Sequence, residues 1–185
     1  MAGKPDNAKM YILTGVCGSG KTTVQRRLAE LLDPKLCQCH DLDDIGLPDK
    51  VDDQWISGQT EAWLQVASRN ATSGCSTLLS GVLCPGIAES CRSFSAAPPL
   101  RYCVFTTEDA ALTRRLNQRY ASQEQRDECR RVTSMSPDVL VRTMLARQSE
   151  FLGWFRESNC DWVECDTSSA PLSDTVQFVR HWMGI

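Results

Sequence analysis

The feature that most constrains the fold lies near the N-terminus. Residues 15–22 read GVCGSGKT and match the complete pattern G-x-x-x-x-G-K-[ST]. An apolar run, residues 10–14, precedes the pattern, and residues 21–32 carry valine and leucine at helical spacing. A glycine-rich turn between a buried strand and a helix lets backbone N–H groups point at an anion, and the helix N-terminus adds its positive dipole. The sequence therefore predicts a phosphate-binding loop, with an ordinary glycine-rich turn as the alternative.

The loop predicts binding of a nucleoside triphosphate together with Mg²⁺. In a loop of this kind the lysine, here Lys21, reaches the β- and γ-phosphates, and the next hydroxyl, that of Thr22, ligates the metal. The predicted nucleotide contacts of the loop are Gly15, Cys17, Gly18, Ser19, Gly20, Lys21, Thr22 and Thr23. The loop alone does not say what is done with the nucleotide.

Apolar runs alternate with helical patterns along the whole chain. Strands are predicted at 10–14, 36–40, 76–80, 101–105 and 161–165, and helices at 21–32, 54–70, 85–94, 108–120, 137–156 and 172–183. Strands separated by helices indicate βαβ units. We therefore expect one α/β domain over residues 1–185, with a five-stranded parallel sheet, helices on both faces and a short lid.

Composition narrows the class of protein. The net charge of -3 argues against a protein that binds nucleic acid through bulk charge. The N-terminal residues show no signal-peptide pattern, and no stretch reaches the roughly 20 apolar residues of a membrane span. We expect a cytoplasmic protein with a small-molecule partner and no membrane association. The sequence gives no information on the oligomeric state.

The phosphate loop and the order of the elements resemble the P-loop kinases of small molecules, the group that includes shikimate, gluconate and adenylate kinases. Residues 40–46 (HDLDDIG) and 60–64 (TEAWL) resemble a set of uncharacterised predicted kinases within that group. The resemblance covers nearly the whole chain and implies an enzyme that uses ATP and Mg²⁺. It implies transfer of the γ-phosphate to a hydroxyl or phosphate of a small molecule, such as a nucleoside or a related metabolite.

The resemblance assigns roles to two aspartates after the second strand. In shikimate-kinase-like enzymes the first aspartate of an Asp-x-Asp pair supports the metal, and the second binds or deprotonates the acceptor hydroxyl. Asp41 and Asp43 match that pattern, which suits Mg²⁺ because it takes oxygen ligands. Asp44, Asp52 and Asp53 compete for the same roles, and capping of turns is the alternative for the pair.

Arginines gather in the region of the predicted lid, residues 120–136. In this enzyme group one arginine of the preceding helix stacks near the adenine and another reaches phosphate oxygens; Arg115 and Arg119 match that arrangement. Within the lid, Arg126 and Arg130 are predicted to contact the transferring phosphate. The lid is polar and lacks apolar periodicity, and we expect its arginines to have no carboxylate partner. A solvated arginine-rich helix is the alternative.

The loop after the fifth strand, residues 165–171, resembles the base-binding loop of these kinases. Thr167 and Ser168 are its candidate nucleotide contacts. The alternative is an ordinary turn that caps the last helix.

One departure from the group concerns the third strand. Many relatives end this strand in an aspartate that holds Mg²⁺, whereas residues 78–81 read LLSG. Metal support is then expected from Thr22 and Asp41. Two tryptophans of the second helix, Trp55 and Trp63, could line an acceptor pocket, although burial in the core is the better interpretation.

The sequence leaves two other functions open. One is a nucleotide-dependent regulatory ATPase or switch without a small acceptor, and the other is a polynucleotide end kinase, which the acidic composition disfavours. A GTPase is also disfavoured, because the chain lacks an N-K-x-D motif.

Overall fold

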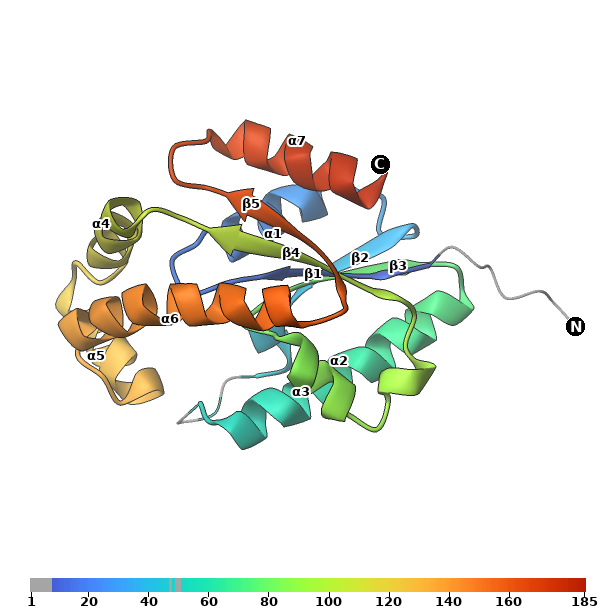
Figure 1. Cartoon of the computed structure of the whole chain (residues 1–185), viewed down its shortest axis with the longest axis horizontal. Helices are drawn as coiled ribbons and strands as arrows, with labels where there is room; N and C mark the ends of the chain where they lie inside the picture. The colour runs from blue at the N-terminus through green and yellow to red at the C-terminus, as the bar shows by residue number, and fades with distance from the viewer. Residues whose placement is uncertain (1–7, 47, 49–50) are drawn as a thin grey trace, which may run out of the picture.

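Five parallel strands form the centre of the protein (Figure 1). The structure is a computed structural model that describes residues 8–46, 48 and 51–185. The strands are β1 (Met10–Thr14), β2 (Cys37–Asp41), β3 (Ser76–Ser80), β4 (Leu100–Thr106) and β5 (Asp161–Asp166). Their order in the sheet is β2-β3-β1-β4-β5, so β1 lies in the middle and its carboxyl end opens onto the phosphate loop.

Helices cover both faces of the sheet, as predicted. They are α1 (Lys21–Leu31), α2 (Asp53–Thr72), α3 (Pro85–Ser90), α4 (Asp109–Arg119), α5 (Gln123–Thr133), α6 (Pro137–Glu157) and α7 (Leu172–Met183). Helices α1 and α7 lie on one face, and α2, α3 and α6 lie on the other (Figure 1). The predicted single α/β domain is confirmed. No helix of the described residues combines the length and the apolar character that a membrane span requires.

The alternation of side chains along β1 builds a core on each face of the sheet. Met10 and Ile12 join the core beneath α2, α3 and α6, whereas Tyr11 and Leu13 join the core beneath α1 and α7. Successive side chains of a strand point to opposite faces, so a strand covered on both sides reads as a continuous apolar run. A third apolar cluster joins the phosphate loop to α4, α5 and α6, which anchors the loop at the carboxyl edge.

The predicted lid is more ordered than its sequence pattern indicates, because most of it is the helix α5. Ser122 and Gln125 form a capping box at its N-terminus, and the segment is rich in good helix formers. Cys129 is the buried residue of this helix. A helix that buries so little shows no apolar periodicity, which explains why the pattern missed it.

The acidic residues at the end of β2 lead directly into a short helical turn. β2 extends to Asp41, and a short 3-10 helix, η1 (Leu42–Ile45), follows it at once. Asp41 caps η1 by accepting from the N–H of Asp43, and Asp44 accepts from the N–H of Asp41. Residues 47, 49 and 50 lie outside the described residues.

Candidate active site

The phosphate loop needs glycine at two positions for steric reasons. Gly15 has a φ of 141°, and a Cβ there would lie 2.4 Å from the carbonyl oxygen of Phe105 on β4. Gly18 has a φ of 87°, and a Cβ there would lie 2.9 Å from the side chains of Leu112 and Leu116 on α4. Both positions favour a residue without a Cβ. The loop is therefore held between β4 and α4 with its backbone at the carboxyl edge of the sheet.

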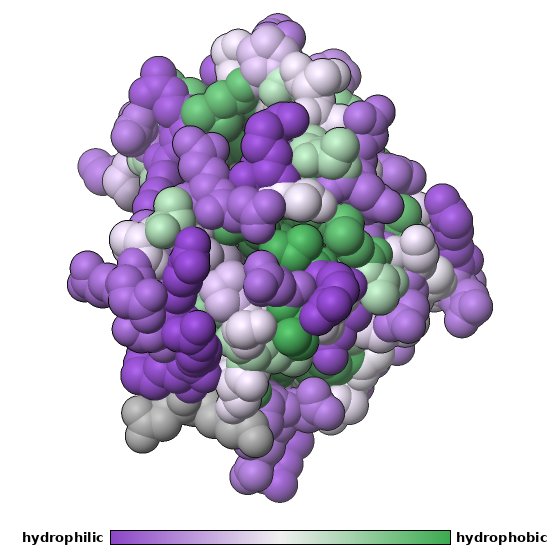
Figure 2. Space-filling view, turned by 90° about the vertical axis from the view of Figure 1, so that its left-hand side faces the viewer, coloured by the Kyte–Doolittle hydropathy of each residue, from purple (hydrophilic) through white to green (hydrophobic). Residues whose placement is uncertain are grey.

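Figure 2 shows the end of the molecule towards which β4 and β5 run. Hydrophobic surface gathers in the middle of this face, and hydrophilic side chains surround it. In parallel α/β sheets ligands bind at this edge.

Lys21 is a buried cation that is bonded to the loop itself. Its ammonium donates to the carbonyl of Val16 at 2.8 Å and lies 3.4 Å from the hydroxyl of Ser19, and the residue is 7% exposed. Burial lowers its pKa from 10.5 to about 8, while the nearby Cys17 and Asp41 act in the opposite direction. Among the described residues no carboxylate forms an ion pair with this ammonium, and a phosphate oxygen would supply such a partner.

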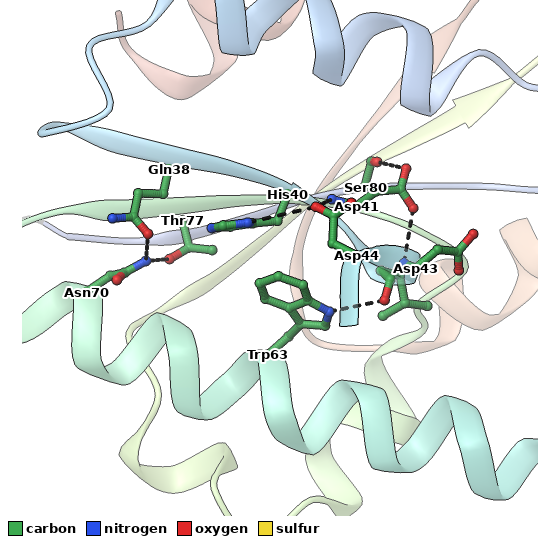
Figure 3. A network of polar contacts seen from close by, with 10 residues as sticks. Gln38, His40, Asp41, Asp43, Asp44, Trp63, Asn70, Thr77 and Ser80 are labelled. Carbon is green, nitrogen blue, oxygen red and sulfur yellow. Dashed lines mark hydrogen bonds and ion pairs between the residues drawn. The ribbon is translucent and has the colours of Figure 1, made fainter. Parts of the chain in front are cut away.

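Asp41, the last residue of β2, is hydrogen-bonded to three other elements. Figure 3 shows its contacts with Ser80 and Asp43. Its Oδ2 accepts from the Thr22 hydroxyl at 2.9 Å and from the Ser80 hydroxyl at 2.7 Å. Its Oδ1 accepts from the N–H of Asp43 at 3.3 Å. The carboxylate is thus tied to α1, to β3 and to η1. Ser80 is a site residue that the sequence reasoning did not name; its place at the end of β3, where the missing carboxylate was noted, was the available signal.

The donor set at this point fits Mg²⁺. The Thr22 hydroxyl and the Asp41 carboxylate are hard oxygen ligands that lie beside one another at the start of α1. The structure therefore brings the two predicted metal ligands, Thr22 and Asp41, together.

The carboxylate of Asp43 accepts no hydrogen bond from the described residues, and neither does that of Asp53, the first residue of α2. The other candidate aspartates are engaged. Asp41 is tied as above, Asp44 accepts from the N–H of Asp41 at 2.8 Å, and Asp52 caps α2 by accepting from the N–H of Trp55 at 2.8 Å. Asp43 reaches solvent, yet partial desolvation and the negative charge of Asp41 raise its pKa, against the pull of Arg119 and Lys21.

Trp63 belongs to the core rather than to an open pocket. It is 4% exposed, its indole N–H donates to the carbonyl of Leu42 at 3.2 Å, and its ring lies 4.6 Å from that of His40 (Figure 3). Trp55 is half-buried against the same core. The interpretation of Trp63 as a core residue is supported, and it holds η1 in place through Leu42.

The two arginines of α4 have different partners. Arg119 is exposed, lies 3.5 Å from the Cys17 sulfur and acts electrostatically on both Lys21 and Asp43. Arg115 instead donates to the carbonyl and the hydroxyl of Thr167. The structure thus brings Arg119 to the phosphate loop and uses Arg115 to fasten the loop after β5.

The lid arginines have local partners. Arg126 donates to the carbonyl of Tyr120 at 3.1 Å, and Arg130 forms an exposed ion pair with Asp127 at 2.8 Å. Arg131 pairs with Glu128. The expectation that the lid arginines face no carboxylate is therefore wrong, because acidic residues lie one helical turn before two of them. Exposed pairs of this kind contribute at most about 1 kcal/mol, so a bound phosphate could displace them.

The candidate base-binding loop is bonded directly to the phosphate loop. The buried hydroxyl of Thr167 donates to the carbonyl of Ser19 at 2.9 Å, although the two residues lie 148 positions apart. The hydroxyl of Ser168 accepts from the N–H of Glu108 at 2.7 Å. Both side chains are engaged within the protein, so a contact of Thr167 or Ser168 with a nucleotide would come from their backbone groups.

Solved structures share this fold over nearly the whole chain. A sugar kinase from Janibacter sp. HTCC2649, solved without ligand, is 16% identical with a TM-score of 0.65, over 96% of this chain and 95% of that one. A gluconokinase from Sinorhizobium meliloti 1021 is 17% identical with a TM-score of 0.61, over 96% and 93%. A shikimate kinase from Acinetobacter baumannii in complex with shikimate is 17% identical with a TM-score of 0.55, over 96% and 93%.

No protein-family model matches the chain, and no curated protein matches its sequence. The similarity to the solved structures shows that the chain has the fold of the P-loop small-molecule kinases. At sequence identities of 16–17% it shows the fold alone.

Proposed function

We propose that this protein is an ATP-dependent kinase that transfers the γ-phosphate of ATP to a hydroxyl of a small molecule. The observation that carries the proposal is the contrast between the two aspartates after β2. Asp41 accepts from three donors, whereas the carboxylate of Asp43, two residues on, has no hydrogen-bond donor among the described residues and has a raised pKa. A phosphate loop that serves only as a switch has no need of a second, unengaged carboxylate beside its lysine.

The charged residues divide the work of phosphoryl transfer. The backbone N–H groups of the loop and the Lys21 ammonium would bind the β- and γ-phosphates, and Arg119 would approach the same oxygens from α4. Asp43 would accept the proton of the acceptor hydroxyl as its oxygen attacks the γ-phosphorus, and ADP would leave. A raised pKa makes this carboxylate a stronger base than an ordinary aspartate.

Thr22 and Asp41 are the residues that would hold Mg²⁺ beside the phosphates. When bound, the ion neutralises charge on the transferring group. Arg126 and Arg130 of α5 remain proposed contacts of the phosphate, because their present partners are exposed and local. α5 also contacts the segment that precedes α2, since the N–H of Val51 donates to the carbonyl of Val132 at 3.4 Å.

The structural neighbours support a small acceptor. They include a sugar kinase, a gluconokinase and a shikimate kinase. The regulatory ATPase and the polynucleotide end kinase, by contrast, have no specific observation in their favour.

A panel of hydroxyl compounds tests the proposal. The purified protein is incubated with MgATP and, separately, with sugars, sugar acids, cyclic polyols and nucleosides, and both ADP and inorganic phosphate are measured. The proposal expects ADP release that depends on one class of acceptor, without a matching release of inorganic phosphate. ADP and phosphate released in equal amounts regardless of acceptor would instead indicate a regulatory ATPase.

A further inference from the structure

Ser80 occupies the position at which a metal-supporting carboxylate is absent. It is the last residue of β3, it is fully buried, and it lies opposite Asp41 in the parallel register of β2 and β3. It also lies opposite Leu13, two residues before Gly15, in the register of β1 and β3. The side chain is therefore placed between the start of the phosphate loop and the candidate metal aspartate.

We propose that Ser80 is a positioning residue for Asp41, and that its hydroxyl sets the carboxylate so that Asp41 and Thr22 together receive Mg²⁺ with the nucleotide. This inference rests on the proposed function. In this role the neutral hydroxyl of Ser80 orients the Asp41 carboxylate for Mg²⁺.

The geometry separates the contribution of Ser80 from that of the other donors. Ser80 and Thr22 donate to the same oxygen of Asp41, at 2.7 and 2.9 Å. Figure 3 shows the contact with Ser80. Thr22 belongs to the phosphate loop and is expected to interact with the metal, and the N–H of Asp43 makes a longer contact of 3.3 Å with the other oxygen. Ser80, by contrast, lies in a buried strand. It can therefore hold the Asp41 carboxylate in one orientation whether or not a ligand occupies the phosphate loop.

Removal of this hydroxyl should lower the affinity for Mg²⁺ without lowering the affinity for the metal-free nucleotide. Residues that orient a metal ligand typically contribute about 10- to 100-fold to metal affinity. Ser80 is not expected to touch the phosphates, because its hydroxyl is directed at Asp41. The expected signature of Ser80→Ala is thus an unchanged affinity for metal-free ADP and a smaller gain in affinity on adding Mg²⁺.

A buried hydroxyl of the same strand provides the matched control. Thr77 is fully buried on β3, and its hydroxyl accepts from the Asn70 amide at 3.0 Å, away from Asp41 (Figure 3). Thr77→Val deletes that hydroxyl at similar volume. Both variants should lose stability, whereas the response to Mg²⁺ should change in Ser80→Ala alone. Ser80→Thr retains a hydroxyl and should restore the wild-type response.

The experiment measures ADP affinity by calorimetry with and without Mg²⁺ for the wild type and the three variants. We expect the Mg²⁺-dependent gain in affinity to fall about tenfold or more in Ser80→Ala and to be kept in Thr77→Val and Ser80→Thr. An unchanged gain in Ser80→Ala, or an equal loss of affinity with and without Mg²⁺, would overturn the inference. If Ser80→Ala does not fold, Ser80→Cys replaces it, because the thiol keeps most of the volume and is a weaker donor.

The outcome for the wild type keeps this inference distinct from the proposed function. A wild-type protein that binds no ADP would contradict the proposed function. A wild-type protein that binds ADP more tightly with Mg²⁺, next to a Ser80→Ala variant that does the same, would contradict the role of Ser80 alone.

Discussion

The buried charge of Lys21 should destabilise the nucleotide-free protein. Lys21→Met should therefore have a higher free energy of unfolding than the wild type. The ammonium is 7% exposed, and its pKa falls from 10.5 to about 8 on burial. Each pKa unit corresponds to about 1.4 kcal/mol, so the buried charge costs about 3 kcal/mol of folding free energy at neutral pH. Methionine has a similar shape and no charge, but it loses the hydrogen bond to Val16, about 1 kcal/mol. The expected net gain is about 2 kcal/mol.

The pH dependence of this gain has a defined sign. Below pH 8 Lys21 is charged in the folded and in the unfolded chain, so the full cost is present. Between pH 8 and 10.5 the unfolded chain binds more protons, and the stability of the wild type therefore rises with pH relative to the variant. The advantage of Lys21→Met should be about 2 kcal/mol at pH 7 and should disappear as the pH approaches 10.5.

Denaturant unfolding at pH 7 and pH 10, without nucleotide, measures both quantities. Other ionisable groups are common to both proteins, so their contributions largely cancel in the difference. Lys21→Arg is the control, since arginine keeps its charge and should give no gain. A Lys21→Met variant less stable than the wild type at pH 7, or a difference that does not change with pH, would refute the reasoning.

Three further predictions concern the site. Asp41→Asn should raise the Mg²⁺ concentration for half-maximal rate at least tenfold, as seen in metal titrations of the rate. Asp43→Asn should lower kcat at saturating Mg²⁺ about 100-fold or more. It should also remove the decrease in rate at acid pH. In the wild type this decrease should begin above the pKa range of an ordinary aspartate, because the pKa of Asp43 is raised. Arg115→Ala should free the loop at Thr167 and raise the KM for ATP several-fold with little effect on kcat. Equal effects of the two aspartate changes on metal dependence and on kcat would contradict the division of roles.

A fourth prediction concerns the predicted lid, residues 121–134. ATP analogue together with acceptor should slow hydrogen exchange there, and adenosine alone should have little effect. Because α5 is a helix with one buried residue, we expect the whole helix to be protected as a unit. A rate of hydrogen exchange that neither ligand changes would contradict the role of a lid and indicate that α5 is an ordinary surface helix.

The sequence predicted the two central strands best, because most of their residues are buried. Residues 10–14 and 76–80 were placed correctly: each is a short run that ends at a glycine, and a strand covered on both faces carries apolar residues on both sides. α5 was missed because Cys129 is its one buried residue, and its helical character lies in its capping box and its composition.

The phosphate loop was recognisable from its residues, but the roles around it needed three-dimensional contacts. The partners of Asp41 come from Thr22 and Ser80, 19 and 39 positions away, and no local pattern links them. The tie between Arg115 and Thr167 spans 52 positions. The local ion pairs of α5 follow from i, i+3 spacing and could have been predicted, had the segment been taken as a helix.

Transfer of label from ATP tests the central claim most directly. The protein is incubated with Mg²⁺, ATP labelled in the γ-phosphate, and a mixture of small hydroxyl compounds, and the products are separated into ATP, inorganic phosphate and organic phosphate. The proposed function predicts label in an organic phosphate for the wild type, none above background for Lys21→Met, and strongly reduced labelling for Asp43→Asn. Label that stays in ATP, or that appears only as inorganic phosphate whatever compounds are present, would contradict it.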